Sequence, residues 1–191
     1  NDVDTFIIPS DCPRFQSGDA KGLVKASTRG DDLYIFVDPG NYSVTYQLFG
    51  YENHLSPDAH FQNLMRLIQA VAGRAHRISV IMPSLYGGRQ HRRVSRESLD
   101  CAFALQQLRD VGVKNIITFD AHDPRVMNAV PTMSFDNVMP TYQVLKCLLH
   151  HVPDVSFHKD NFMIVSPDEG AMNRNMYYSS VLGCNLGMFY K

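Results

Sequence analysis

The 191 residues contain 45% hydrophobic side chains, which is enough for the core of one large globular domain or somewhat more. A formal net charge of -1 and a pI near 6.8 provide no overall field that would recruit nucleic acid or an anionic membrane. The four scattered cysteines include no C-x-x-C pair, which argues against a disulfide framework or a zinc site and favours a reducing cytoplasm. No apolar run reaches membrane-spanning length and no signal peptide is visible. Because the chain opens on Asn1 rather than Met and ends abruptly on Lys191, we interpret it as a fragment or as the ordered part of something longer.

The first third of the chain carries clear signals for strands and one helix. Short apolar runs predict strands at 6–8 and 33–37. Ser56 can cap a helix whose apolar residues then repeat at helical spacing as far as Val71. Phe15 is the one large apolar residue of a polar loop. Its ring either folds back onto the core or is offered to a flat ligand such as a nucleobase.

The next predicted strand, at 77–82, is followed by a flexible cationic loop. Two glycines precede the run Arg89–Arg93, which contains three arginines. Guanidinium groups can bind phosphate oxygens bidentately, and glycine lets the backbone approach a phosphate closely. A solvated basic loop is the usual alternative for such a charge run, but its position after a strand favours phosphate. A helix is predicted to begin at Ser95 and to continue to Gly112.

Residues 113–125 combine a buried strand with an abruptly polar end. The apolar run 116–119 predicts the strand, and Asp120, His122 and Asp123 follow it within four residues. Ligands of open α/β sheets bind beyond the carboxyl ends of strands. Two carboxylates and an imidazole at that place can hold a divalent cation and the phosphates that it carries. The alternative is a polar loop in which Asp120 or Asp123 caps the next helix.

The last third continues the alternation, with helices predicted at 141–152 and 171–182 and strands at 162–165 and 186–190. The whole pattern predicts an α/β fold, with a mostly parallel sheet and helices on both faces. Loops after three of the strands are then expected at one edge of the sheet: Arg89–Arg93, Asp120–Asp123 and Asp168–Glu169. Cationic groups beside acids at such an edge suit Mg²⁺ and a polyphosphate.

Several short motifs, taken in order, resemble the ribose-phosphate diphosphokinase family (phosphoribosyl diphosphate synthetases) from Arg14 to Lys191. Any one of them is weak, but their order and the matching strands between them are specific. The motifs are Arg14-Phe15-x-x-Gly18-Asp19, Arg29-Gly30-Asp31-Asp32, Arg89-Gln90-His91-Arg92, Thr118-Phe119-Asp120-Ala121-His122 and Val165-Ser166-Pro167-Asp168-x-Gly170.

The resemblance implies a phosphoribosyltransferase-like fold, with an N-terminal ATP-binding α/β domain over 1–140 and the truncated start of a second, similar domain over 141–191. It implies transfer of the diphosphoryl group of ATP to ribose 5-phosphate, which gives 5-phosphoribosyl diphosphate and AMP. The implied setting is nucleotide biosynthesis in the cytoplasm by a homo-oligomer that binds neither nucleic acid nor a membrane.

The resemblance also implies roles for individual residues. His122 and Asp168 match metal ligands of the family, so Mg²⁺ is the expected ion, and Asp120 supports that site. Lys191 and His122 are the implied catalytic residues, because the charge of the matching lysine stabilises the transferring diphosphoryl group. The residues implied in ATP binding are Phe15, Asp19, Arg89, Gln90 and Arg92. The first two reach the adenine from a neighbouring subunit.

Some positions depart from the family pattern. Ser17 and His91 each replace an aspartate, and Asp19 is one methylene shorter than the family's glutamate. Asp123 and Arg125 replace an alanine and a glutamine. A non-catalytic regulatory or nucleotide-binding subunit related to the family is therefore the alternative function, and a plain nucleotide-binding α/β domain is a third. The family's Thr-Gly-Gly-Thr loop for ribose 5-phosphate is absent, so we expect these residues not to turn over by themselves.

Overall fold

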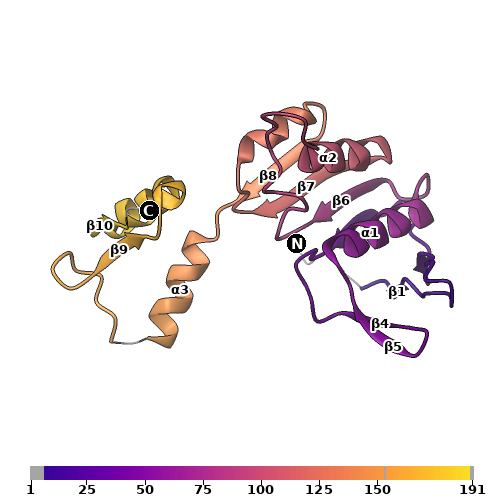
Figure 1. Ribbon diagram of the computed structural model, residues 1–191, viewed down its shortest axis with the longest axis horizontal. Helices are drawn as coiled ribbons and strands as arrows, with labels where there is room; N and C mark the ends of the chain where they lie inside the picture. Colours follow the sequence, from indigo (N-terminus) through magenta and orange to yellow (C-terminus); the bar gives the residue numbers. More distant parts are fainter. Residues whose placement is uncertain (1–6, 153, 190–191) are drawn as a thin grey trace. The chain divides into compact units, whose positions relative to one another are not determined.

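The computed structural model describes residues 7–152 and 154–189, and the chain divides into two compact units, Asn1–Val138 (unit 1) and Met139–Lys191 (unit 2). Each unit is described by itself. The elements of unit 1 are β1 (Ser10–Asp11), β2 (Leu23–Val24), β3 (Asp32–Phe36), β4 (Thr45–Leu48), β5 (Tyr51–His54), α1 (Pro57–Val71), β6 (Arg77–Ile81), α2 (Asp100–Asp110), β7 (Val113–Phe119), the 3-10 helix η1 (Pro124–Ala129) and β8 (Ser134–Val138) (Figure 1). Those of unit 2 are α3 (Thr141–His151), β9 (Met163–Ser166), the 3-10 helix η2 (Glu169–Ala171), α4 (Met172–Leu182) and β10 (Asn185–Met188).

Unit 1 is built on a parallel sheet with the strand order β3-β6-β7-β8. Because the strands follow one another in chain order, right-handed crossovers place α1, α2 and η1 over the same face. The side chains of Val80 and Ile116, which are paired across β6 and β7, are fully buried beneath these helices. The α/β class with a mostly parallel sheet is confirmed.

The opposite face of this sheet carries aromatic side chains that are open to solvent. Tyr34 and Phe36 of β3 are 56% and 67% exposed, whereas Leu33 and Ile35 alternate with them and pack against the core. The described helices of unit 1 therefore cover one of the two faces of its sheet, whereas the sequence pattern predicts helices on both.

Helix α1 forms as the sequence predicts. The Ser56 Oγ accepts the N–H of Ala59 at 3.2 Å, and Pro57 occupies the first turn, where its missing N–H costs nothing. The apolar stripe along the helix is buried against the sheet: Phe61, Leu64, Met65, Ile68 and Val71. A cap of this kind stabilises a helix by about 1 kcal/mol.

Other local predictions are wrong. Ile7 and Ile8 are not in a strand, and Phe6 lies outside the described residues. The helix predicted from Ser95 begins at Asp100, because the preceding residues are tied into the cationic loop. There the Gln90 side-chain amide donates to the carbonyl oxygen of Ser98 at 2.8 Å.

Unit 2 contains a two-stranded parallel sheet in which Ile164 of β9 is paired with Leu186 of β10. The predicted helices and strands of this region are confirmed as α3, α4, β9 and β10 within one or two residues of their described bounds. Helix α4 ends at Gly183, whose φ of 63° is the left-handed conformation that glycine adopts without strain. Within the described part of the chain, no helix has the length and apolar character needed to cross a membrane.

Candidate functional site at the carboxyl edge of the unit 1 sheet

Two of the three polar loops lie side by side at the carboxyl edge of the unit 1 sheet. Strands β6 and β7 are neighbours, and the Phe119 N–H donates to the carbonyl oxygen of Pro83 at 3.2 Å where both strands end. The loop after β6 and the loop after β7 therefore start next to each other, as predicted. The expectation that the loop after β9 shares this sheet edge is wrong, since β9 pairs with β10 in a separate sheet.

Strand β8 holds the start of the β7 loop. The Asp120 N–H donates to the carbonyl oxygen of Val138 at 3.1 Å, and the N–H of the buried Ala121 donates to Asn137 Oδ1 at 2.8 Å. Asp120 has a φ of 48°, a backbone conformation that is uncommon outside glycine. These two hydrogen bonds fix the backbone so that the next side chain, His122, is exposed to solvent.

Asp123 is engaged by Arg125 from the same loop. The guanidinium donates from Nη2 to Oδ2 at 2.6 Å and from Nε to Oδ1 at 2.9 Å, and the Arg125 N–H donates to Oδ1 at 3.0 Å. These hydrogen bonds hold the pKa of the Asp123 carboxyl well below its ordinary value. Asp123 thereby caps η1, so the capping interpretation is confirmed for this residue. A carboxylate held in this way has little capacity left for a cation.

His91 links the β6 loop to the β7 loop. Its Nε2 lies 3.4 Å from Asp123 Oδ2, and both side chains are only 12% exposed. Its ring centroid lies 5.0 Å from that of His122, with the ring planes tilted by 34°. The His91 Nδ1 is buried and has no hydrogen-bond partner among the described residues.

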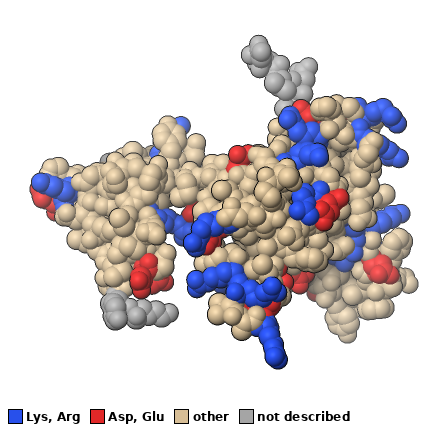
Figure 2. All heavy atoms as spheres, turned by 90° about the horizontal axis from the view of Figure 1, so that it is seen from above, with Lys and Arg blue, Asp and Glu red and all other residues tan. Residues whose placement is uncertain are grey.

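The rest of the β6 loop presents cationic side chains to solvent. Arg89 and Arg92 are exposed, whereas the side-chain amide of Gln90 braces the loop through the carbonyl of Ser98. Gly87 has a φ of 65°, and a Cβ there would approach the backbone nitrogen of Cys101 to 3.1 Å, so a larger residue would be strained. Figure 2 shows Lys and Arg side chains in several separate groups with Asp and Glu among them, in agreement with a net charge near zero.

The Phe15 loop is a small hairpin elsewhere in unit 1. Arg14 and Ala20 form a bridge, and the Phe15 N–H donates to the carbonyl oxygen of Asp19 at 2.8 Å. The Phe15 ring is 52% exposed, so it is not folded back into the core. The Ser17 hydroxyl donates to the Asp19 carboxylate at 2.8 Å.

The remaining predicted site residues belong to unit 2. Asp168 is exposed, and its Oδ1 caps η2 by accepting the Ala171 N–H at 3.0 Å. Lys191 lies outside the described residues. The predicted metal site joins His122 of unit 1 with Asp168 of unit 2, and it stays a prediction. Between residues 7 and 189, no group of three or more His, Cys, Asp or Glu side chains is arranged to hold a metal ion.

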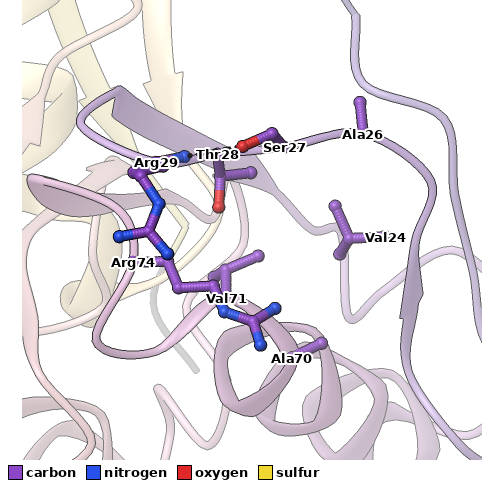
Figure 3. Close-up of a pocket in the computed structure, with 8 residues that line it drawn as sticks. All are labelled: Val24, Ala26, Ser27, Thr28, Arg29, Ala70, Val71 and Arg74. Carbon is purple, nitrogen blue, oxygen red and sulfur yellow. Dashed lines mark hydrogen bonds between the residues drawn. The ribbon is translucent and has the colours of Figure 1, made fainter.

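A separate pocket of about 260 Å³ lies at the amino edge of the sheet, between the loop before β3 and the last turn of α1. Figure 3 shows the Arg29 and Arg74 side chains lining this space. Helix α1 runs antiparallel to the strands, so its carboxyl end and this pocket are on the side away from His122.

Sequence reasoning did not identify Asn137 or the contact between His91 and Asp123. Asn137 is on β8, a strand that was not predicted, and its partner Ala121 is 16 residues away in the chain. The His91–Asp123 contact joins loops that follow different strands. The sequence marks these two residues only because each departs from the family pattern.

Known proteins resemble this chain over most of its length. Residues 1–112 match the N-terminal domain of ribose phosphate pyrophosphokinase. Ribose-phosphate pyrophosphokinase A of Dictyostelium discoideum is 26% identical over 183 residues, which cover 93% of this chain and 50% of that protein. The ribose-phosphate pyrophosphokinase of Staphylococcus aureus strain Mu50 is 24% identical over 171 residues, which cover 88% and 48%.

A solved structure supports the fold. The crystal structure of phosphoribosylpyrophosphate synthetase from Mycobacterium smegmatis matches 97% of this chain and 57% of that chain, with a TM-score of 0.77 at 19% identity. The chain spans about half the length of the curated relatives that it matches. Because more than half of its residues match the family domain, the chain belongs to the ribose-phosphate pyrophosphokinase family.

Proposed function

We propose that the full-length protein transfers the diphosphoryl group of ATP to the C1 hydroxyl of ribose 5-phosphate. The hydroxyl oxygen bonds to the β-phosphorus, and the bond from that phosphorus to the oxygen bridging it to the α-phosphorus breaks. AMP leaves with that oxygen, the hydroxyl proton is released, and 5-phosphoribosyl diphosphate is formed. The observation that carries the proposal is the pairing of an arginine-rich loop with the exposed His122 at the carboxyl edge of a sheet from this family.

The proposal assigns ATP binding to unit 1. Arg89 and Arg92 are exposed cations that can bind phosphate oxygens, and Gln90 completes this part of the site. Phe15 and Asp19 are assigned to the adenine of a nucleotide held by a neighbouring subunit, which makes the protein a homo-oligomer. The exposed Phe15 ring supports this role, because bases stack on aromatic rings.

Mg²⁺ enters as part of the substrate, magnesium–ATP, and lowers the charge of the transferring phosphates. Mg²⁺ is usually bound by one or two protein side chains together with water and phosphate oxygens, so the exposed His122 and Asp168 suffice in number. Asp120 supports the position of His122. Lys191 is assigned the charge that stabilises the transferring diphosphoryl group.

We also propose that unit 2 is the start of a second α/β domain similar to the first. Its two-stranded parallel sheet has exposed apolar side chains, among them Met163 and Val165 of β9 at 53% and 45%. Parallel sheets are stable when further strands and helices cover such side chains. We further propose that the protein acts in the cytoplasm and that its product enters nucleotide biosynthesis.

A non-catalytic regulatory subunit is the second candidate, and one observation favours it. His91, Asp123 and Arg125 form an internal network beside His122, at positions where the family pattern has other residues. AMP release from magnesium–ATP by the full-length protein separates the two candidates.

The enzyme is expected to release AMP only when ribose 5-phosphate is present. His122→Ala should lower the rate about a hundredfold, because a metal ligand is lost, and the control His158→Ala should keep the wild-type rate. No AMP from the wild type would favour the regulatory candidate, and equal rates for the wild type and His122→Ala would remove His122 from the mechanism.

A further inference from the structure

A chain of side chains connects the two loops of the candidate site. Arg125 binds the Asp123 carboxylate through two N–H groups, and Asp123 Oδ2 faces His91 Nε2 at 3.4 Å. The His91 ring in turn lies beside the His122 ring, with centroids 5.0 Å apart. The cationic loop after β6 and the His122 loop after β7 are thus in contact through named groups.

Burial distinguishes this contact from an ordinary surface pair. His158 and Asp160 of unit 2 are 3.3 Å apart, nearly the same distance, but their side chains are 62% and 71% exposed. The side chains of His91 and Asp123 are both 12% exposed. Because water and salt screen exposed pairs, the less exposed pair constrains its loops more strongly.

The position of His91 in the sequence links the His91–Asp123 contact to the proposed ATP site. His91 lies between Gln90 and Arg92, two residues that the proposed function assigns to ATP, and Asp123 directly follows His122. The hydrogen bond from Gln90 to Ser98 ties the cationic loop to itself, whereas the His91–Asp123 contact ties it to the β7 loop.

We propose that the His91–Asp123 contact is a latch that positions the cationic loop against His122, with Arg125 holding the Asp123 carboxylate in place. His91 and Asp123 are positioning residues, since they act on magnesium–ATP through Arg89, Arg92 and His122. This inference rests on the proposed function for the identity of the ligand.

Steady-state kinetics of the full-length protein tests the latch. His91→Ala and Asp123→Ala should each raise the KM for magnesium–ATP about tenfold and leave kcat within about twofold, because the contact that positions the cationic loop for binding is lost. His91→Gln should restore most of the affinity, since its amide N–H can reach the place of Nε2. The double variant should be no worse than either single variant, because both substitutions break one contact.

The matched controls are His158→Ala, which removes the exposed pair of nearly the same spacing, and Arg77→Gln, which breaks a 2.8 Å pair with Asp32 at the amino ends of β3 and β6. Both should retain the wild-type KM. An unchanged KM in His91→Ala, or a double variant whose effects multiply, would overturn the latch.

A second measurement does not depend on turnover. In protein labelled with ¹⁵N-histidine, the ring signals of His122 should shift in His91→Ala and in Asp123→Ala and stay unchanged in His158→Ala. If the wild type releases no AMP, the proposed function fails, while these signals still decide whether the two loops are coupled. Unchanged His122 signals in both latch variants would refute the coupling.

Discussion

Asn137 offers a sharp test of how the fold positions His122. Its Oδ1 accepts the N–H of Ala121 at 2.8 Å, and the Ala121 side chain is 6% exposed. Substitution Asn137→Ala removes the acceptor and leaves a buried N–H without its partner. Such a loss costs about 1–3 kcal/mol in the free energy of unfolding.

The expected cost can be measured by denaturant and by heat. For a chain of this size, each kcal/mol lowers Tm by about 2–4 °C. Asn137→Asp keeps an oxygen at the Oδ1 position and should lose less than Asn137→Ala. Asp136→Ala is the matched control, because Asp136 is the preceding residue of β8 and its side chain is exposed, so it should change stability by less than about 0.5 kcal/mol.

The same variant should also affect the reaction, because the freed backbone directly precedes His122. A displacement of a functional group by about 1 Å costs up to a hundredfold in rate. We expect AMP release by Asn137→Ala to fall ten- to a hundredfold, and that by Asp136→Ala to stay at the wild-type rate. Wild-type stability and wild-type AMP release in Asn137→Ala would together refute the reasoning that β8 holds the His122 loop.

Three further predictions concern Phe49, Cys101 and Tyr86. Phe49 has a φ of 52° in the two-residue turn of the β4–β5 hairpin and is 76% exposed. Because asparagine adopts this backbone conformation more readily, Phe49→Asn should raise the free energy of unfolding, measured with denaturant, by about 0.5–1 kcal/mol. A lower free energy of unfolding in the variant would mean that the Phe49 ring makes a stabilising contact. Burial raises the pKa of the Cys101 thiol to about 11, whereas Cys147 is exposed. Iodoacetamide at pH 8 should therefore modify Cys147 and leave Cys101 intact until the protein unfolds. Equal labelling of the two cysteines in the folded protein would contradict this. The Tyr86 hydroxyl donates to Asp58 at 2.6 Å, which raises its pKa to about 12. The stability contributed by that hydrogen bond is present below pH 10 and lost as the pH rises towards 12, and an ultraviolet titration in which all tyrosines ionise near pH 10 would exclude it.

The elements that were predicted from the sequence depend on local patterns. Helix α1 has a serine cap and an apolar stripe, and β7 contains the apolar residues Ile116, Ile117 and Phe119 close together, so neighbouring residues alone specify them. Strand β8 was missed because Ser134–Val138 is an edge strand with alternating polar residues and only two apolar ones. The β4–β5 hairpin was missed because its turn is Phe49-Gly50 rather than a pair such as Asn-Gly.

The candidate site was predictable in its residue types but not in its connections. The position of His122 after a strand and the arginines after the neighbouring strand follow from sequence order and parallel topology. The hydrogen bond from Ala121 to Asn137 depends on the register of β7 with β8, which pairs Thr118 with Asn137. The His91–Asp123 contact depends likewise on how two irregular loops fold, and no local pattern specifies that.

The fate of the γ-phosphate tests the proposed reaction most directly. The full-length protein is incubated with [γ-³²P]ATP, Mg²⁺ and ribose 5-phosphate, and the nucleotides and sugar phosphates are separated. Transfer of the diphosphoryl group predicts that the label moves into the sugar product and that AMP forms in equal amount. Formation of ADP, or release of the label as inorganic phosphate without a labelled sugar, would contradict the proposed function.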